Sequence, residues 1–392
     1  MSSDLSLEQQ KAPSGALSFA MVAGEASGDL LASLLIQGMQ MRWPHAQGAG
    51  IGGPRMAQMG FDAWWPHERL AVRGYVEVLR HYRGIVAIRE QLKQRLLNQR
   101  PDVFIGVDAP DFNLDLERHL KSAGIPTVHF VCPSIWAWRP ERIEKIRHSV
   151  DHMLCIFPFE PALLAQSGIE STYVGHPLAQ TIPMVPDRSA ARHALGLDVN
   201  RPVVALLPGS RQSEIEHLLP RFIQAARLMQ RKDPELQFVL PAIPSLLALV
   251  QVVLAAQGGL PGLHVLQGQS HTALAACDVT LIASGTATLE AALFKRPMVI
   301  GYHMNWLSWL IMKRQKLQPW VGLPNILCQD FVVPEFLQEQ CTPEKLADAT
   351  LSWLSQPDRV HRLTSRFEQL HQNLQRDTAD LATHALEKVL GA

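Results

Sequence analysis

Short apolar runs alternate with longer helical patterns along the whole of this 392-residue chain. In the first half, the runs with strand character lie at 17–23, 103–107, 127–131, 153–156 and 172–175. A second series lies at 202–207, 238–240, 264–266, 279–283 and 297–300. Strands separated by helices predict parallel sheets covered by helices on both faces. We therefore predict an α/β protein with two Rossmann-like, doubly wound domains facing a cleft, and a helical C-terminal tail.

The length of the chain and a proline-rich passage indicate where the domains divide. At about 150 residues per domain, two domains are expected, and Pro177–Pro186 has the composition of an interdomain linker. From Pro343 onward the pattern is wholly helical. We expect a first domain over 1–178, a second over 187–350, and a helical tail over 351–392 that packs back across both.

Composition argues against several classes of protein. Apolar residues make up 47% of the chain and the formal net charge is zero, which favours a large core and argues against nucleic acid as the main partner. The five cysteines have no paired spacing, so we expect a reducing compartment and no zinc site. The N-terminal residues are polar, and the longest uncharged apolar run, 245–256, is shorter than a spanning helix of about 20 residues. We expect a soluble cytoplasmic protein that can still touch a membrane.

The stretch 279–299, VTLIASGTATLEAALFKRPMV, has the features of a ligand site. Its β-type run ends in Ser284, Gly285 and Thr286, and a helix with Glu290 on its first turns follows. Free N–H groups and the helix dipole at such a corner suit a phosphate, and Glu290 could accept hydrogen bonds from two ribose hydroxyls. The corner indicates a nucleotide diphosphate held without a metal. An ordinary strand–turn–helix corner is the alternative.

A second corner of this kind follows the run 202–207, where Pro208-Gly209-Ser210-Arg211 leads into a helix. The planar guanidinium of Arg211 matches phosphate oxygens. A positive charge in the first turn of a helix is unfavourable, which favours diphosphate binding by Arg211 over a merely solvated side chain. No Asp-x-Asp pair at a strand end and no metal-ligand spacing of histidines indicates a metal ion.

Carboxylates follow the strands of the first half as well. Asp108 stands at the tip of one strand and is a candidate general base, with a structural role as the alternative. Asp111 is placed to cap the helix that follows. After the first strand, in GEASGD, we expect Ser27 or Asp29 to cap a helix and Glu25 to line the cleft.

The segment 302–316 mixes tryptophans and aliphatic residues with a basic end that includes Lys313 and Arg314. Trp306 and Trp309 would lie on its apolar side. An interfacial helix against anionic lipid has this composition. A core helix with a basic C-terminal end has it too, so both interpretations stay open from the residues alone.

Seven motifs occur in order along the chain: GEASGD, DAPDFN, PSIWAWR, YVGHP, LPGSR, SGTATLE and LPN. Together they resemble the lipid A disaccharide synthase family, over about residues 17 to 340. The resemblance implies a GT-B fold, with the acceptor bound by the first domain and the UDP-sugar by the second. It implies transfer of a sugar from UDP-2,3-diacylglucosamine to 2,3-diacylglucosamine 1-phosphate. The products would be the β-1′,6-linked disaccharide and UDP.

The resemblance also implies roles for single residues. Asp108 matches the proposed general base, and Glu25 and Ser27 match the acceptor side. The residues that match the UDP side are Ser210, Arg211, Ser284, Gly285, Thr286, Glu290 and Asn325. One departure is His303, where an arginine or lysine is expected, and it puts the charge of that surface in doubt. No cofactor is implied, and the membrane partner would be the cytoplasmic face of the bacterial inner membrane, which favours Trp306 and Trp309 as lipid contacts.

Other functions compete with this one. Another UDP-N-acetylglucosamine-dependent GT-B enzyme, such as a peptidoglycan transferase or a 2-epimerase, would share the nucleotide side of the site. A nucleotide-sugar-binding protein without activity would bind UDP-sugar and show no acceptor-dependent release of UDP. A Rossmann-type oxidoreductase is disfavoured, because the first turn lacks the pattern G-x-G-x-x-G.

Overall fold

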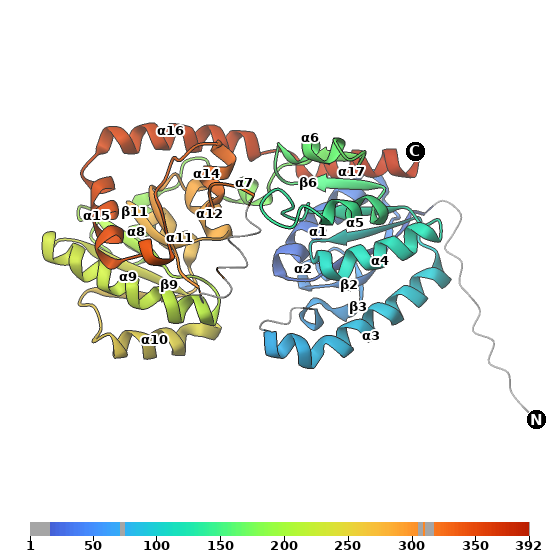
Figure 1. Ribbon diagram of the computed structural model, residues 1–392. Coiled ribbons are helices and arrows are strands. Elements are labelled where there is room, and N and C mark those ends of the chain that lie inside the picture. Colours follow the sequence, from blue (N-terminus) through green and yellow to red (C-terminus); the bar gives the residue numbers. More distant parts are fainter. Residues whose placement is uncertain (1–15, 71–74, 305–308, 310–316, 392) are drawn as a thin grey trace, which may run out of the picture. The chain divides into compact units, whose positions relative to one another are not determined.

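Two all-parallel sheets organise the chain, whose computed structural model describes residues 16–70, 75–304, 309 and 317–391. The described chain divides into two units (Figure 1). Unit 1 holds the residues up to Ile135, then Arg139–Pro177, and those from Arg376 onward. Unit 2 holds Trp136–Trp138 and Leu178–Gln375. The predicted α/β class, with two doubly wound domains and a helical C-terminal region, is confirmed.

Unit 1 contains a seven-stranded sheet in the order β3-β2-β1-β4-β5-β6-β7. Every neighbouring pair is parallel. Its strands are β1 (Ser18–Ala23), β2 (Gln47–Gly52), β3 (Asp62–Pro66), β4 (Val103–Val107), β5 (Thr127–Phe130), β6 (His152–Cys155) and β7 (Ser171–Tyr173). Because parallel strands need crossover connections, helices cover both faces of the sheet.

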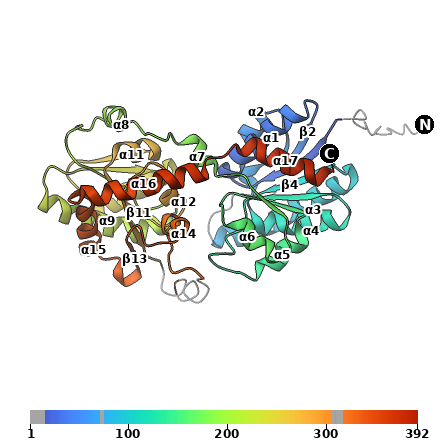
Figure 2. The ribbon, with the colours of Figure 1, turned by 90° about the horizontal axis from the view of Figure 1, so that it is seen from above.

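The helices of unit 1 form two groups (Figure 2). On one face, α1 (Ala26–Arg42) packs against α17 (Thr378–Leu390) and α2 (Pro54–Gln58). On the other, α4 (Pro110–Ser122) packs against α3 (Tyr75–Gln99) and α5 (Arg142–Ser149). The shorter α6 (Glu160–Ala165) lies beside β7, and the 3-10 turn η1 spans His67–Arg69. The last helix of the chain thus completes a unit made otherwise of its first half.

Unit 2 contains a six-stranded sheet in the order β10-β9-β8-β11-β12-β13, again parallel throughout. Its strands are β8 (Val203–Leu207), β9 (Gln237–Ala242), β10 (Leu263–Gln267), β11 (Val279–Ala283), β12 (Met298–Tyr302) and β13 (Glu335–Leu337). The central strands β8 and β11 are buried over their full length. This burial explains their mostly apolar sequences, VVALL and VTLIA.

The helices of unit 2 also form two groups. On one face, α9 (Gln212–Lys232) packs against α10 (Leu247–Ala256) and α15 (Pro343–Leu354). On the other lie α8 (Arg188–Ala194), α11 (Ser270–Ala276) and α12 (Thr286–Leu293), with α16 (Pro357–Leu374) against α12. The remaining elements are α7 (Pro177–Thr181), α14 (Leu323–Cys328), η2 (Pro244–Leu246) and η3 (Gln338–Gln340). The passage predicted as a linker therefore begins with a short helix, α7.

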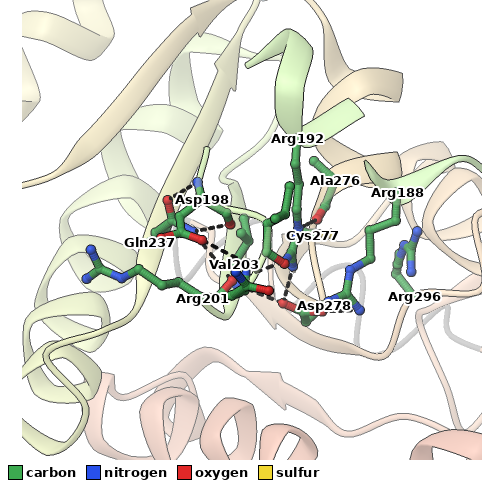
Figure 3. A network of polar contacts seen from close by, with 12 residues as sticks. Arg188, Arg192, Asp198, Arg201, Val203, Gln237, Ala276, Cys277, Asp278 and Arg296 are labelled. Carbon is green, nitrogen blue, oxygen red and sulfur yellow. Dashed lines mark hydrogen bonds and ion pairs between the residues drawn. The ribbon is translucent and has the colours of Figure 1, made fainter. Parts of the chain in front are cut away.

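A buried charge network fixes α8 to the sheet of unit 2 (Figure 3). Asp278, just before β11, pairs with Arg192 at 2.5 Å and with Arg188 at 2.8 Å. The same carboxylate accepts the N–H of Val203, the first residue of β8, at 2.8 Å. Because the Arg192 side chain is almost fully buried, this pairing offsets the desolvation of its charge. The network lies at the edge where the strands begin, opposite the turns that follow them.

Three short strands were not predicted. The sequence of β2, QGAGIG, has three glycines and a single β-branched residue, Ile51, so its strand propensity is weak. Its glycines serve packing instead, since a Cβ at Gly48 would lie 2.2 Å from the ring of Phe19. The edge strands β3 and β13 span only five and three residues. Contacts with neighbouring strands, rather than local propensity, make these segments strands.

Asp29 belongs to α1, but its side chain caps the start of α2. Its carboxylate accepts the N–H groups of Gly53 at 2.9 Å, Arg55 at 3.0 Å and Met56 at 3.1 Å, all at the start of α2. The N-cap residue of α1 is Glu25, and no side chain caps that end. The expectation that Ser27 or Asp29 caps α1 is therefore wrong, because Asp29 points away from the turn that carries it.

Replacement of Asp29 by Ala should lower the free energy of unfolding by about 2–4 kcal/mol, because buried N–H groups would lose their acceptor. Urea denaturation followed by circular dichroism measures this change. The exposed Ser27→Ala variant is the control and should change stability by less than about 0.5 kcal/mol. Equal stability of both variants would contradict the capping role.

Candidate active site

Parallel pairing brings the ends of β1 and β4 together in unit 1. The turn after β1 carries Glu25 and Ser27, and the turn after β4 carries Asp108. The two turns touch, since a Cβ at Gly24 would lie 2.7 Å from the Cβ of Ala109. The structure thus brings together the three residues predicted for the acceptor side.

Asp108 has a well-defined backbone and an uncommitted carboxylate. Its N–H donates to the carbonyl of Phe130 at 2.8 Å, and its carbonyl accepts from the amide of Asn113 at 2.8 Å. Asp108 and Ala109 both have left-handed backbones, with φ of 53° and 44°. The carboxylate is partly exposed and forms no hydrogen bond or ion pair with any described residue. It is therefore available to accept a proton from a ligand.

Glu25 and Ser27 are exposed at the start of α1, where their side chains can reach a ligand. Asp111 does not cap α4 as predicted. The left-handed turn starts the helix at Pro110, so Ala109 is the N-cap residue. The Asp111 carboxylate instead pairs with Arg142 at 2.7 Å and is mostly exposed.

In unit 2, β8 and β11 are neighbours, so the two corners predicted for the diphosphate lie side by side. At the β11 corner, Gly285 is the N-cap residue of α12, with φ of 150°, and no side chain caps the helix. Thr286 is exposed on the first turn. The Ser284 hydroxyl donates to the carbonyl of Val321 at 3.0 Å. The N–H groups at this end of α12 are open to an anion.

Glu290 lies on the second turn of α12 and is partly buried. One of its carboxylate oxygens lies 3.1 Å from Nε2 of His271, on α11. This histidine was not predicted, because nothing in the local sequence distinguishes it. It fixes the position of Glu290 and leaves the second oxygen for a further donor.

At the β8 corner, Arg211 is the N-cap residue of α9 and its side chain is 76% exposed. Glu214 accepts the N–H groups of Ser210 at 2.8 Å and Arg211 at 3.1 Å. It also pairs with the Arg211 guanidinium at 3.1 Å. Because Glu214 occupies these N–H groups, the exposed side chains of Ser210 and Arg211 are the groups of this corner that can meet a phosphate. The sequence does not reveal this role of Glu214, because the N-cap residue is Arg211 and not the Ser or Thr of a usual capping box.

Two residues at the end of β12 also belong to this region. Burial raises the pKa of the Tyr302 phenol, and the fields of Glu214 and Arg211 act on it as well. Burial lowers the pKa of His303, and the neighbouring Arg221 and His217 lower it further. Both effects favour the neutral form of the His303 side chain.

Asn325, at the start of α14, is fully buried. Its carbonyl oxygen accepts the N–H groups of Val332 and Val333, at 2.8 and 2.9 Å. Its amide donates to the Val333 carbonyl at 2.9 Å and to Glu335 at 2.8 Å. All hydrogen-bonding positions of this side chain are thus used within unit 2, so Asn325 shapes the site without a side-chain atom left for UDP.

Glu335 connects Asn325 to the loop beside the β11 corner. Its two carboxylate oxygens accept the N–H groups of Val321 and Gly322, both at 2.9 Å. Val321 in turn accepts the hydroxyl of Ser284. The loop before α14 is therefore held against the predicted diphosphate corner by Asn325 and Glu335, and sequence analysis did not identify Glu335.

The predicted membrane residues are mostly outside the described residues: Trp306, Lys313 and Arg314. Trp309 is described and is partly buried. Among the described helices, none combines the length and the apolar character needed to cross a bilayer. Within the same part of the chain, no three His, Cys, Asp or Glu side chains gather as metal ligands would.

A surface cavity of about 510 Å³ lies in unit 1, away from these turns. It is lined by Lys121, Asp151, His152 and Lys388, among others, where β5 and β6 begin. Ligands of doubly wound folds bind where strands end. Its place in the fold and its mixed charges therefore argue against this cavity as the substrate site.

Comparisons with known proteins identify one family. Residues 19–389 match the family model described as lipid-A-disaccharide synthetase. The lipid-A-disaccharide synthase of Albidiferax ferrireducens is 65% identical over 379 residues, which cover 95% of this chain and 97% of that protein. The lipid-A-disaccharide synthase of Verminephrobacter eiseniae is 59% identical over 380 residues, with 95% and 97% coverage.

Solved structures share the fold at low identity. The UDP-GlcNAc 2-epimerase from Neisseria meningitidis, bound to UDP-GlcNAc, has a TM-score of 0.62 at 11% identity and covers 96% of this chain and 100% of its own. A glycotransferase of kitacinnamycin has a TM-score of 0.62 at 16% identity, with 95% and 98% coverage. These likenesses support a GT-B architecture and leave the choice of reaction to the family. On the strength of the match over nearly its whole length, the chain belongs to the lipid-A-disaccharide synthase family.

Proposed function

We propose that this protein is an inverting glycosyltransferase that joins UDP-2,3-diacylglucosamine to 2,3-diacylglucosamine 1-phosphate. The oxygen of the acceptor 6-hydroxyl forms a bond to C1 of the donor sugar, and the bond from C1 to the diphosphate breaks. The electron pair leaves with UDP. Membership of the family supports the reaction, and the uncommitted carboxylate of Asp108 is the observation that supports its mechanism.

Asp108 accepts the proton of the acceptor hydroxyl as the new bond forms. The carboxylate lies at a strand end, partly exposed, beside Glu25 and Ser27, which would bind polar groups of the acceptor. C1 develops oxocarbenium character in such reactions, so a carboxylate of ordinary basicity can serve as the base.

The groups of unit 2 stabilise the departing diphosphate. The open N-terminus of α12, at Ser284, Gly285 and Thr286, supplies N–H groups and the positive end of a helix dipole. The exposed guanidinium of Arg211 supplies a positive charge from the neighbouring strand end. Glu290 accepts hydrogen bonds from the ribose. Because helix dipole and guanidinium together balance the negative charge, we propose that UDP is held without a metal ion.

Replacement of Asp108 by Ala should reduce acceptor-dependent UDP release about 10²–10⁴-fold, because the hydroxyl would lose its base. UDP release is measured with both substrates, in the presence of EDTA. The matched control is Asp111→Asn, since this neighbouring carboxylate is exposed and pairs with Arg142; it should keep the full rate. Release of UDP without acceptor would instead favour an epimerase, and binding of UDP-sugar without release would favour a non-catalytic protein.

Replacement of Arg211 by Ala should weaken UDP binding about 10-fold or more, because one charge-assisted hydrogen bond to phosphate is lost. Isothermal titration with UDP measures this affinity. Arg231→Ala removes an exposed guanidinium at the other end of α9 and is the control. An affinity for UDP equal to that of the unmodified protein would remove Arg211 from the site.

We also propose that the protein acts at the surface of the inner membrane, on its cytoplasmic face, where diacylated substrates reside. The composition of the segment around Trp306, Trp309, Lys313 and Arg314 supports this proposal.

The variant Trp306→Ser/Trp309→Ser should therefore bind vesicles of anionic phospholipid several-fold more weakly, with its thermal unfolding unchanged. Cosedimentation measures the bound fraction. Trp43→Ser, a partly exposed tryptophan of unit 1, is the control and should bind as the unmodified protein does. Undiminished binding by the double variant would place the lipid contact elsewhere.

A further inference from the structure

Three fully buried polar side chains lie beneath the turn that carries Asp108. Asn113 and Glu117 are one turn apart on α4, and His129 lies on β5. All three have no exposed surface. Nδ1 of His129 lies 2.7 Å from Oε1 of Glu117, and burial raises the pKa of this carboxyl. The mechanism proposed above does not use any of these groups.

The cluster is built into the strand that ends at Asp108. Gly106 of β4 is the direct neighbour of His129 on β5. A Cβ at Gly106 would lie 2.1 Å from Oε1 of Glu117 and 2.9 Å from Cβ of Asn113. A larger residue at this position would displace both side chains, so β4 is shaped to admit them two residues before Asp108.

Asn113 connects the cluster to the candidate base. Its amide nitrogen donates to the carbonyl of Asp108 at 2.8 Å and lies 3.4 Å from the carbonyl of Val22, near the end of β1. Asp108 and Ala109 have left-handed backbones, a conformation that is unfavourable for residues other than glycine. The hydrogen bond from Asn113 to the Asp108 carbonyl therefore supports an otherwise unfavourable backbone conformation at the candidate base.

The cluster is incompletely hydrogen-bonded within the described part of the protein. Oδ1 of Asn113, Oε2 of Glu117 and Nε2 of His129 are buried and have no partner among the described residues. Apolar side chains of the same size would avoid this penalty. Buried polar atoms without hydrogen-bond partners are found most often at functional sites. These three atoms lie directly behind the strand end that carries Asp108, the residue to which we assign the role of base.

We propose that Asn113 is a positioning residue for Asp108, braced from behind by the Glu117–His129 pair. This inference rests on the proposed function. The acceptor proton still goes to the Asp108 carboxylate, and Asn113 makes no contact with substrate. It restricts the backbone at Asp108, so that the carboxylate stays where the acceptor hydroxyl binds. A small displacement of a reacting group is enough to slow such a step about 10²-fold.

The test is a double-mutant cycle between Asn113 and Asp108, measured as acceptor-dependent UDP release at saturating substrates. Asn113→Ala should lower kcat about 10–100-fold and leave KM and UDP affinity within about threefold. In the Asp108→Ala background, the same change should cause no further loss, because the residue acts through the base. Asn113→Asp, which is isosteric and replaces the donor by an oxygen, keeps the test possible if the alanine variant does not fold.

Glu117 is tested in the same way. Glu117→Ala should lower kcat severalfold, while Glu117→Gln, which keeps an oxygen for His129, should restore most of the rate. Thr127→Val is the matched control for lost stability, since its buried hydroxyl bonds to Ser149 at the opposite edge of the same sheet. This control should unfold at a lower temperature with an unchanged kcat.

Two results would overturn the positioning role while the proposed function stands. One is an unchanged kcat in Asn113→Ala, and the other is an equal loss of rate in the presence and absence of the Asp108 carboxylate. An unmodified protein that releases no UDP with both substrates would remove the proposed function, and this inference with it.

Discussion

Parallel pairing of β1 with β4 and of β8 with β11 is the constraint on which the candidate site depends. In a parallel sheet all strands end at one edge, so the turns after neighbouring strands meet there. Pairing of β1 with β4 therefore joins Glu25 and Ser27 to Asp108, although they precede it in the chain by 83 and 81 positions. Pairing of β8 with β11 likewise joins the Arg211 turn to the start of α12.

Within that frame, many polar residues of the motifs hold other groups in place. Asp29 caps α2, Asn113 restrains Asp108, Glu214 closes the Arg211 turn, and Asn325 fixes the loop beside Ser284. Each bonds to backbone groups that helices and turns leave unpaired. Fewer polar side chains of these turns stay exposed, as Arg211 and Thr286 do, or partly exposed, as Asp108 does. Rigid support of a small reactive set is what a transfer between two bound sugars requires.

The sequence predicted the architecture well because burial on both faces leaves an apolar run that is easy to recognise. It located the strand ends and hence Asp108, Arg211 and Ser284. The weak strands β2, β3 and β13 escaped prediction, because their pairing depends on neighbours distant in sequence. The capping role expected of Asp111 was wrong because the left-handed backbone at Asp108 and Ala109 starts the helix earlier, and the motif does not reveal that backbone conformation.

By itself, the sequence determined the class of fold, the family, and the residues that follow the strongly apolar strands, since all of these are read from local order and type. Only the tertiary structure decided which polar side chain serves which backbone group. Asn325 and Asp29 belong to polar motifs of the same kind as those of Ser284 and Glu25. Their side chains are nevertheless buried and hydrogen-bonded within the protein. The physical reason is that hydrogen-bond partners are chosen by distance in space, and a motif records only distance along the chain.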